Sequence, residues 1–155
     1  THSPRGPQAV PGLMLQEDLK INSGRLRAKL LVFRTGHDLR RFWRRVNPYG
    51  ARLEMNCRGA VNELQTEVFG FKRGKQVLHH NEVDARYFCV IGLLADYLGS
   101  EIITHEAVHA GFCYARRVGK RDPNARLGDE EEVCYPAGRV ARQIVRVLRR
   151  ARLIE

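Results

Sequence analysis

The stretch "SEIITHEAVHAGFCYARR", residues 100–117, decides how the rest of this 155-residue chain is organised. Its apolar residues recur at helical intervals, while Ser100 can cap a helix and Glu101 favours a helix N-terminus. We therefore expect a helix from about residue 101 to about residue 117. Within it His105 and His109 are four positions apart, so both side chains lie on one face of the helix.

The histidine pair has the spacing of a metal site. Two imidazoles one helical turn apart can both direct a ring nitrogen at one ion, and Zn²⁺ accepts such nitrogens at about 2.0–2.1 Å. Glu106 is rotated by about 100° from His105, which places its carboxylate beside such an ion rather than on it. There it could act as a general base towards a metal-activated water. The alternative is a surface helix that carries two solvated histidines.

A catalytic zinc site needs a third protein ligand and an open position. None of the six histidines follows the motif, and Phe112 and Ala115 stand where the longer pattern HExxHxxGxxH requires Gly and His. Cys113 continues the row of His105 but lies two turns away, too far to share one ion on a straight helix. Elimination leaves the acidic stretch "GDEEEVCYPAG", residues 128–138.

The acidic stretch opens a second expected helix, from about residue 129 to about residue 153. Acids near a helix N-terminus interact favourably with the helix dipole, which explains one or two of them without a metal. Glu130, and not Glu131, shares a face with the apolar residues of this helix and so points toward its apolar side. Glu131, Glu130, Glu132 and Cys134 all stay open as the third ligand. The apolar face consists of Val133, Ala137, Val140, Ile144 and Leu148. The opposite face carries Arg139, Arg142, Arg146, Arg149 and Arg150.

Around these two helices the chain resembles the small gluzincin-like (HExxH…E) zinc metallopeptidases of phages and bacteria. The resemblance covers about residues 85–150 and is specific at HEAVH. It is looser in the second helix, where an acidic pair is followed by a small residue, an aromatic residue and a glycine. These positions are Glu130 and Glu131, then Cys134, Tyr135 and Gly138. Residues before about 85 contain no motif of that family.

The resemblance implies a zinc-dependent metallopeptidase, a hydrolase acting on peptide or protein substrates. It implies His105, His109 and Glu131 as the metal ligands. It further implies Glu106 as general base and acid, with Tyr135 as a hydrogen-bond donor to a ligand or to the substrate oxyanion. A zincin-like fold would follow, with the histidine helix and a C-terminal ligand-bearing helix packed on a small sheet.

The remaining sequence predicts an α+β domain with a small mixed or antiparallel sheet. "RLRAKLLVF", residues 25–33, alternates as a half-buried strand does, and residues 38–46 have a helical apolar stripe with Asp38 as a plausible N-cap. Residues 51–80 suggest short strands broken by glycines, and "ARYFCVIGLLADYL", residues 85–98, suggests another strand. We expect one domain over residues 13–155, preceded by an irregular arm over residues 1–12.

The sequence predicts how two small residues, Cys89 and Gly111, are packed. Cys89 lies inside an apolar run and is most simply a buried small hydrophobe. Gly111 lies inside the histidine helix, where glycine is unfavourable by up to about 1 kcal/mol relative to alanine. Close approach of the second helix would account for Gly111, and fraying of the helix at that point is the alternative.

The charge balance leaves a second function open. The chain has a net charge of +10, with 22 Arg against 5 Lys. This excess reflects either codon bias or an anionic partner, such as nucleic acid or an acidic protein, bound through an arginine-rich surface. A nucleic-acid- or partner-binding protein on a zincin scaffold, with a structural or lost metal, is therefore the alternative to a peptidase. A virion or assembly component is a third.

The cellular setting follows from cysteine usage and hydropathy. The four cysteines form no C-x-x-C pair, which argues against a disulfide framework or a zinc ribbon and favours a reducing, cytoplasmic location. No apolar run reaches the roughly 20 residues of a membrane helix, so we expect no membrane partner.

Overall fold

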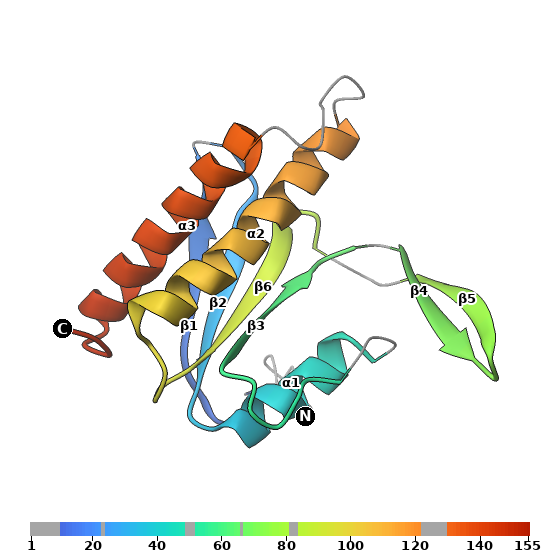
Figure 1. Cartoon of the computed structure of the whole chain (residues 1–155), viewed down its shortest axis with the longest axis horizontal. Helices are drawn as coiled ribbons and strands as arrows, with labels where there is room; N and C mark the ends of the chain where they lie inside the picture. The colour runs from blue at the N-terminus through green and yellow to red at the C-terminus, as the bar shows by residue number, and fades with distance from the viewer. Residues whose placement is uncertain (1–9, 23, 49–51, 66, 81–83, 122–129) are drawn as a thin grey trace, which may run out of the picture.

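The computed structural model describes residues 10–22, 24–48, 52–65, 67–80, 84–121 and 130–155. It contains a four-stranded sheet, a separate two-stranded hairpin and three helices (Figure 1). The strands of the sheet are β1 (Leu13–Lys20), β2 (Arg27–Phe33), β6 (Tyr87–Leu94) and β3 (Gly59–Glu63). The hairpin is formed by β4 (Glu67–Lys72) and β5 (Lys75–His80). The helices are α1 (Gly36–Val46), α2 (Ser100–Arg121) and α3 (Glu130–Arg150).

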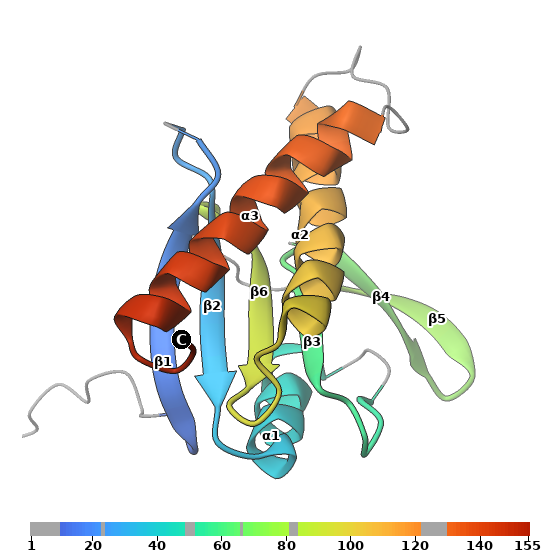
Figure 2. The ribbon, with the colours of Figure 1, turned by 60° about the vertical axis from the view of Figure 1, so that its left-hand side comes forward.

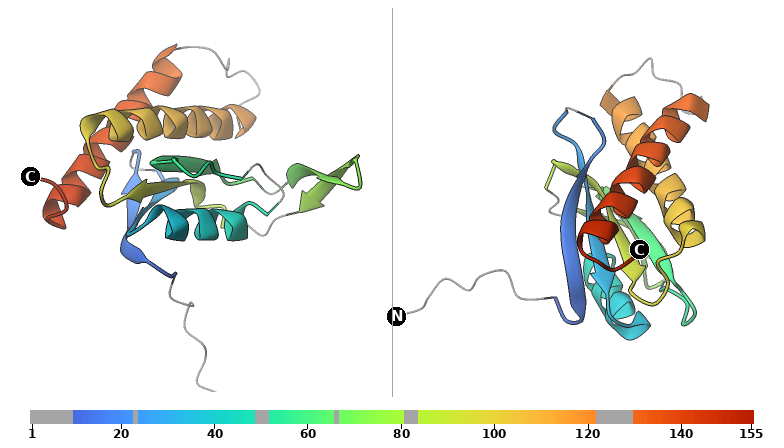
Figure 3. Two further views of the ribbon diagram at one scale, coloured as in Figure 1. Left: turned by 60° about the horizontal axis from the view of Figure 1, so that its bottom comes forward. Right: turned by 90° about the vertical axis from the view of Figure 1, so that its left-hand side faces the viewer.

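The sheet is mixed and has the strand order β1-β2-β6-β3. β2 and β6 are parallel, whereas β1 pairs with β2 and β3 pairs with β6 in antiparallel fashion. Helices α2 and α3 cover one face of the sheet and α1 covers part of the other face (Figures 2 and 3). The expected α+β class with a small mixed sheet is therefore confirmed.

The central strands are apolar on both sides because both faces of the sheet are covered. Alternate residues of β2 point to opposite faces, so Leu30 joins the core under α2 and α3 while Leu31 joins the core under α1. Cys89 on β6 is fully buried beneath α2, as its apolar context predicts. The larger core includes Ile91, Leu93, Ala107, Ala110, Val140, Ile144 and Leu148.

Helices α2 and α3 cross at Gly111. A Cβ atom at this position would lie 2.7 Å from the Val133 carbonyl oxygen and 2.9 Å from the Ala137 Cβ atom. Only glycine allows the two backbones to approach this closely. The expectation that Gly111 marks close packing of the second helix is confirmed, and α2 continues past it to Arg121 without fraying.

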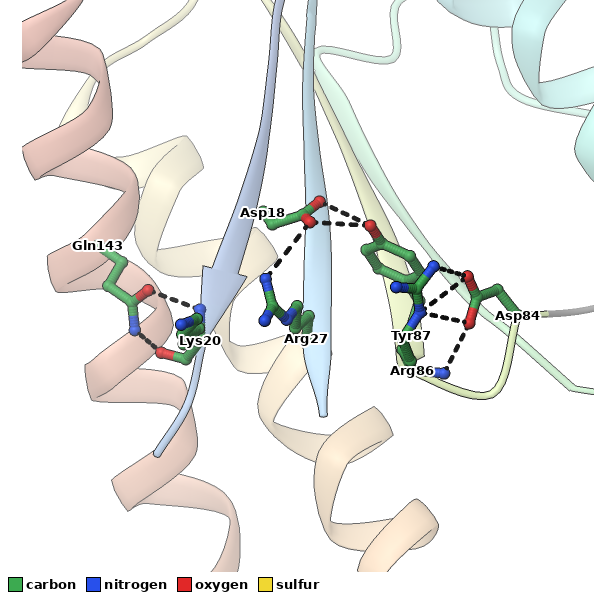
Figure 4. Close-up of polar contacts among 7 residues, drawn as sticks. All are labelled: Asp18, Lys20, Arg27, Asp84, Arg86, Tyr87 and Gln143. Carbon is green, nitrogen blue, oxygen red and sulfur yellow. Dashed lines mark hydrogen bonds and ion pairs between the residues drawn. The ribbon is translucent and has the colours of Figure 1, made fainter. Parts of the chain in front are cut away.

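Polar contacts join β1 to its neighbours at one end of the sheet (Figure 4). The Tyr87 hydroxyl on β6 donates to both carboxylate oxygens of Asp18 on β1, at 2.9 and 2.8 Å, across the intervening β2. These bonds, with burial, raise the pKa of Tyr87. The Lys20 backbone N–H donates to Gln143 Oε1 at 2.8 Å, and the Gln143 amide donates back to the Lys20 carbonyl. This exchange attaches the end of β1 to α3.

Several expectations differ from the structure. β1 begins at Leu13, directly after the expected arm, and was not expected as a strand. Thr35, not Asp38, is the N-cap of α1: its side chain accepts from the Asp38 backbone N–H at 3.2 Å, so the N-cap prediction was wrong. Residues 1–9 of the expected arm lie outside the described residues. No helix in the described part of the chain is long and apolar enough to span a membrane.

Candidate metal centre

The HEAVH segment lies in the N-terminal half of α2, where that helix lies against β6 and beside β3 (Figure 1). Ala107 and Ala110 face the core and are almost completely buried. The two histidines are on a more exposed side of the helix, and Glu106 points between this side and the sheet. Burial of the small residues therefore fixes the rotation of α2 and with it the direction of the three motif side chains.

His105 and His109 converge. Their Nε2 atoms are 3.3 Å apart and their ring centroids 4.9 Å apart. Two nitrogens bound to one tetrahedral ion at about 2.0–2.1 Å are separated by about 3.3–3.4 Å. The same separation suits one N–H···N hydrogen bond between two neutral rings. The separation of the two Nε2 atoms thus fits two ligands of a single Zn²⁺ ion and fits a hydrogen-bonded histidine pair equally well.

His109 favours its neutral form. Burial lowers the pKa of His109, and the nearby positive charges of His105 and Arg116 lower it further. A histidine must be neutral to bind a metal through its ring nitrogen. The surroundings of His109 therefore support ligand chemistry at lower pH than an exposed histidine would.

Glu106 is a buried carboxylate beside the pair. The residue is 3% exposed, and its Oε1 atom lies 3.9 Å from His105 Nε2. Burial raises the pKa of Glu106, and the charge of His105 partly offsets this effect. It forms no hydrogen bond with the other described residues. A carboxylate held without a hydrogen-bond partner next to two metal-binding nitrogens can accept a proton from a molecule bound there.

Glycine at position 59 makes room for this carboxylate. A Cβ atom on Gly59, the first residue of β3, would lie 3.1 Å from Glu106 Cγ and 3.3 Å from Glu106 Oε1. The Cys57 thiol donates to the Gly59 carbonyl at 2.9 Å. Burial raises the pKa of Cys57, and the charge of Glu106 adds to this effect. Neither residue was identified from the sequence, because only the pairing of β3 with β6 brings them to α2.

A hollow of about 480 Å³ opens beside His105 and Glu106. Its walls are the start of β3, the N-terminal turn of α2 and the loop that joins β6 to α2. The Arg58 guanidinium lies over the Tyr97 ring at 4.6 Å from its centroid, on the rim of this hollow. The hollow is thus accessible to a molecule of several heavy atoms next to the carboxylate.

The expected third ligand lies elsewhere. Glu131 and Tyr135 line a different hollow, of about 310 Å³, together with Tyr114 and Val118 and without either histidine. Tyr135 is 65% exposed. Within the residues that the structure describes, no three His, Cys, Asp or Glu side chains are grouped to hold one ion. The structure therefore brings His105, Glu106 and His109 together, but not Glu131 or Tyr135.

The alternatives to Glu131 stand as follows. The side chain of Glu130 is outside the described part of the chain. Glu132 lines the same hollow as Glu131, and Cys134 is exposed. Cys113 is buried, and its pKa is lowered by a hydrogen bond from Cys89 and raised in turn by burial. Cys113 thus faces the core and Cys89 rather than the histidine pair.

No protein-family model, no curated protein and no solved structure matches this chain. The resemblance to gluzincin-like metallopeptidases consequently stays a prediction.

Proposed function

We propose that this chain is a zinc-dependent metallopeptidase that hydrolyses peptide bonds. The observation that carries the proposal is the 3.3 Å separation of the His105 and His109 Nε2 atoms with the buried Glu106 carboxylate beside them. A surface helix with two solvated histidines would not need a carboxylate that is almost completely buried and has no hydrogen-bond partner among the described residues. Such burial is unfavourable for stability, which points to a role in chemistry.

The roles of the residues follow from their positions. His105 and His109 would hold the metal through Nε2, and a bound Zn²⁺ would supply a Lewis acid that polarises a carbonyl and acidifies water. Glu106 would take a proton from the attacking water and deliver it to the leaving amine. Its raised pKa favours both tasks near neutral pH, because a proton acceptor with a very low pKa returns protons poorly.

The substrate class is supported by β3. This strand is at the edge of the sheet, and its first residue, Gly59, adjoins Glu106. An edge strand offers unpaired backbone groups to which an extended peptide can add as a further strand. A polypeptide bound along β3 would therefore pass the Glu106 carboxylate.

Glu131 is kept as the proposed third ligand, and Tyr135 as the proposed donor to the oxyanion. Both would require the first turns of α3 to shift towards the histidines, since Glu131 now borders another hollow. Zinc titration of the Glu131→Gln and Glu130→Gln proteins separates these two candidates. The substitution that weakens zinc binding by tenfold or more identifies the ligand, and the other serves as its control.

Elemental analysis combined with a peptidase assay tests the proposed function. Wild type and Glu106→Gln should both contain near-stoichiometric zinc, whereas His105→Ala should lose it. Only wild type should cleave an unfolded protein substrate. Wild-type protein without zinc after metal supplementation contradicts the proposal. Zinc with no cleavage under any condition favours the binding-protein alternative with a structural metal.

A further inference from the structure

The β4–β5 hairpin projects from the domain (Figures 1 and 2). Its strands pair only with each other and form a sheet of their own. An isolated two-stranded hairpin is marginally stable in water. A hairpin that projects in this way therefore contributes little to the core and has its surface available for a partner.

The tip of the hairpin concentrates positive charge. Arg73 and Gly74, with φ of 53° and 76°, form the two central positions of a type I′ turn. Lys72 and Lys75 are directly opposite each other in the register, and all three cations are exposed. Like charges in opposed positions are unfavourable, as is a left-handed conformation at a non-glycine residue. The tip sequence thus works against the stability of the turn that it forms.

These cations have no counter-charge among the described residues. Lys72, Arg73 and Lys75 form no ion pair there, although carboxylates elsewhere in the described chain do pair with arginines. Asp84, for example, binds Arg86 at 2.7 Å, and this bond lowers the pKa of Asp84 to about 2 (Figure 4). Within the part of the chain that the structure describes, the three charges of the tip are therefore available to an external anion.

One face of the hairpin adds an exposed aromatic ring. Phe71 is 78% exposed and directly precedes the tip. Its register partner is Gln76, and Leu78, two positions further on, shares that face and is 41% exposed. The ring is therefore available as a flat stacking surface directly before Lys72 and within four residues of all three cations.

We propose that the β4–β5 hairpin is an arm that binds single-stranded nucleic acid. Lys72, Arg73 and Lys75 neutralise backbone phosphates, and an unpaired base stacks on Phe71. Sequence-tolerant binders of single strands combine these two features, a cationic track and exposed aromatic rings. A lipid surface would need more apolar area than one phenyl ring and one leucine provide. An acidic protein could neutralise the cations, but it does not present a flat ring at every unit as a single strand of nucleic acid does.

This inference goes beyond the proposed peptidase and does not depend on it. The arm involves none of the residues of the candidate metal centre, and its binding requires no metal. A peptidase with such an arm would act on proteins that are near nucleic acid.

Fluorescence anisotropy of the full-length protein with a labelled single-stranded oligonucleotide of mixed sequence tests the arm. The variant Lys72→Gln/Arg73→Gln/Lys75→Gln should lower the slope of log affinity against log salt by about 2, since each single-strand phosphate contact contributes about 0.7. Between 1 M and 0.1 M salt, the affinity of the wild type should therefore increase about 100-fold more than the affinity of the variant. The matched control removes three exposed arginines from α3, as Arg142→Gln/Arg146→Gln/Arg150→Gln, and should lose clearly less.

Three variants test the stacking surface. Phe71→Ala should weaken binding about tenfold, Phe71→Trp should retain it, and Leu78→Ala on the same face should change it little. Equal losses for the tip and α3 variants would assign binding to overall charge and overturn the proposal. No binding to oligonucleotides, equal binding to duplex, or binding only to anionic vesicles or acidic peptides would overturn it too. Circular dichroism confirms that each variant is folded.

Discussion

Burial of the Glu106 carboxyl lowers folding stability but suits its proposed role as a proton acceptor. Its carboxyl is protonated in both folded and unfolded chains below the usual pKa of 4.5. Burial raises the pKa of this carboxyl in the folded chain, so above pH 4.5 it ionises first in the unfolded chain. Folding stability therefore falls as pH rises from 4.5 to the pKa of the folded state. Glu106→Gln should therefore stabilise the metal-free protein at pH 7 and have no effect below about pH 4.

Urea unfolding of both proteins with a chelator at several pH values measures this difference. The gain should grow with pH and then level off once the folded carboxyl has ionised. A constant gain at all pH values would show that the substitution acts through packing and not through the ionised carboxylate.

Gly59 controls the position of the same carboxylate. Gly59→Ala would place a methyl group 3.1 Å from Glu106 Cγ, closer than the roughly 3.5–4.0 Å of ordinary carbon contacts. We expect the proposed peptidase activity to fall by about tenfold or more, since small displacements of the proposed general base would be costly, while zinc content stays unchanged. Gly99→Ala is the control, because a Cβ atom there meets nothing within 4 Å. Similar activity in both variants would remove Gly59 from this role.

The sequence predicts the local part of the site and not its distant part. The convergence of His105 and His109 depends only on helical periodicity, which brings residues four apart onto one face. The burial of Glu106 by Gly59 depends on β3 pairing with β6, and the position of Glu131 depends on how α3 crosses α2. Neither is encoded in the spacing of neighbouring residues, so Gly59 was missed and Glu131 stays a prediction.

At the scale of elements, the crossing of α2 and α3 rests on one small residue. Gly111→Ala would place its Cβ 2.7 Å from the Val133 carbonyl oxygen, which must separate the helices. We expect a loss of about 1–3 kcal/mol in unfolding free energy, typical of overpacking. Gly138→Ala on α3 is the matched control, since nothing lies within 4 Å, and it should gain up to about 1 kcal/mol from helix propensity. Urea denaturation compares the two, and equal effects would refute close packing at Gly111.

Elements with a strong apolar period were the ones that the sequence located. β2, β6, α2 and α3 all match expected segments, because their buried positions recur with period 2 or 3.6 or as continuous apolar runs. β1 was missed, because seven of its eight residues are exposed or half-exposed and only Leu19 is fully buried. The cap of α1 was misassigned because Thr35 and Asp38 can both cap a helix, and their mutual hydrogen bond at 2.7 Å is visible only in the structure.

At the scale of the whole molecule, metal binding should stabilise the entire domain. α2, which carries both histidines, contacts α3, β3 and β6, so a ligand held by α2 is lost only when this assembly opens. Free zinc at about 100 times its dissociation constant adds about 2.7 kcal/mol, which corresponds to about 5–11 °C in Tm for a chain of this size. Thermal scans with zinc and with a chelator measure the shift. His105→Ala should abolish it, and an equal shift in that variant would indicate zinc bound elsewhere.

The chain leaves the sheet after β3 and returns to it at β6 next to the same point, so the hairpin could be removed from this protein or inserted into another. The Leu64 N–H donates to the Phe88 carbonyl at 3.0 Å, so residues 65–86 leave the sheet and return to it at almost one point. Replacing this segment by a turn of about five residues shortens the loop roughly fourfold. The entropic cost of closing the loop then falls by about 1 kcal/mol. Against this stands the loss of the Arg27 N–H bond to the Arg86 carbonyl, at 2.7 Å, and of the Arg117 bond to the Ala85 carbonyl, at 3.3 Å. The sheet and its histidine helix could thus be produced as a minimal body, and the hairpin could be grafted between two paired strands of another protein.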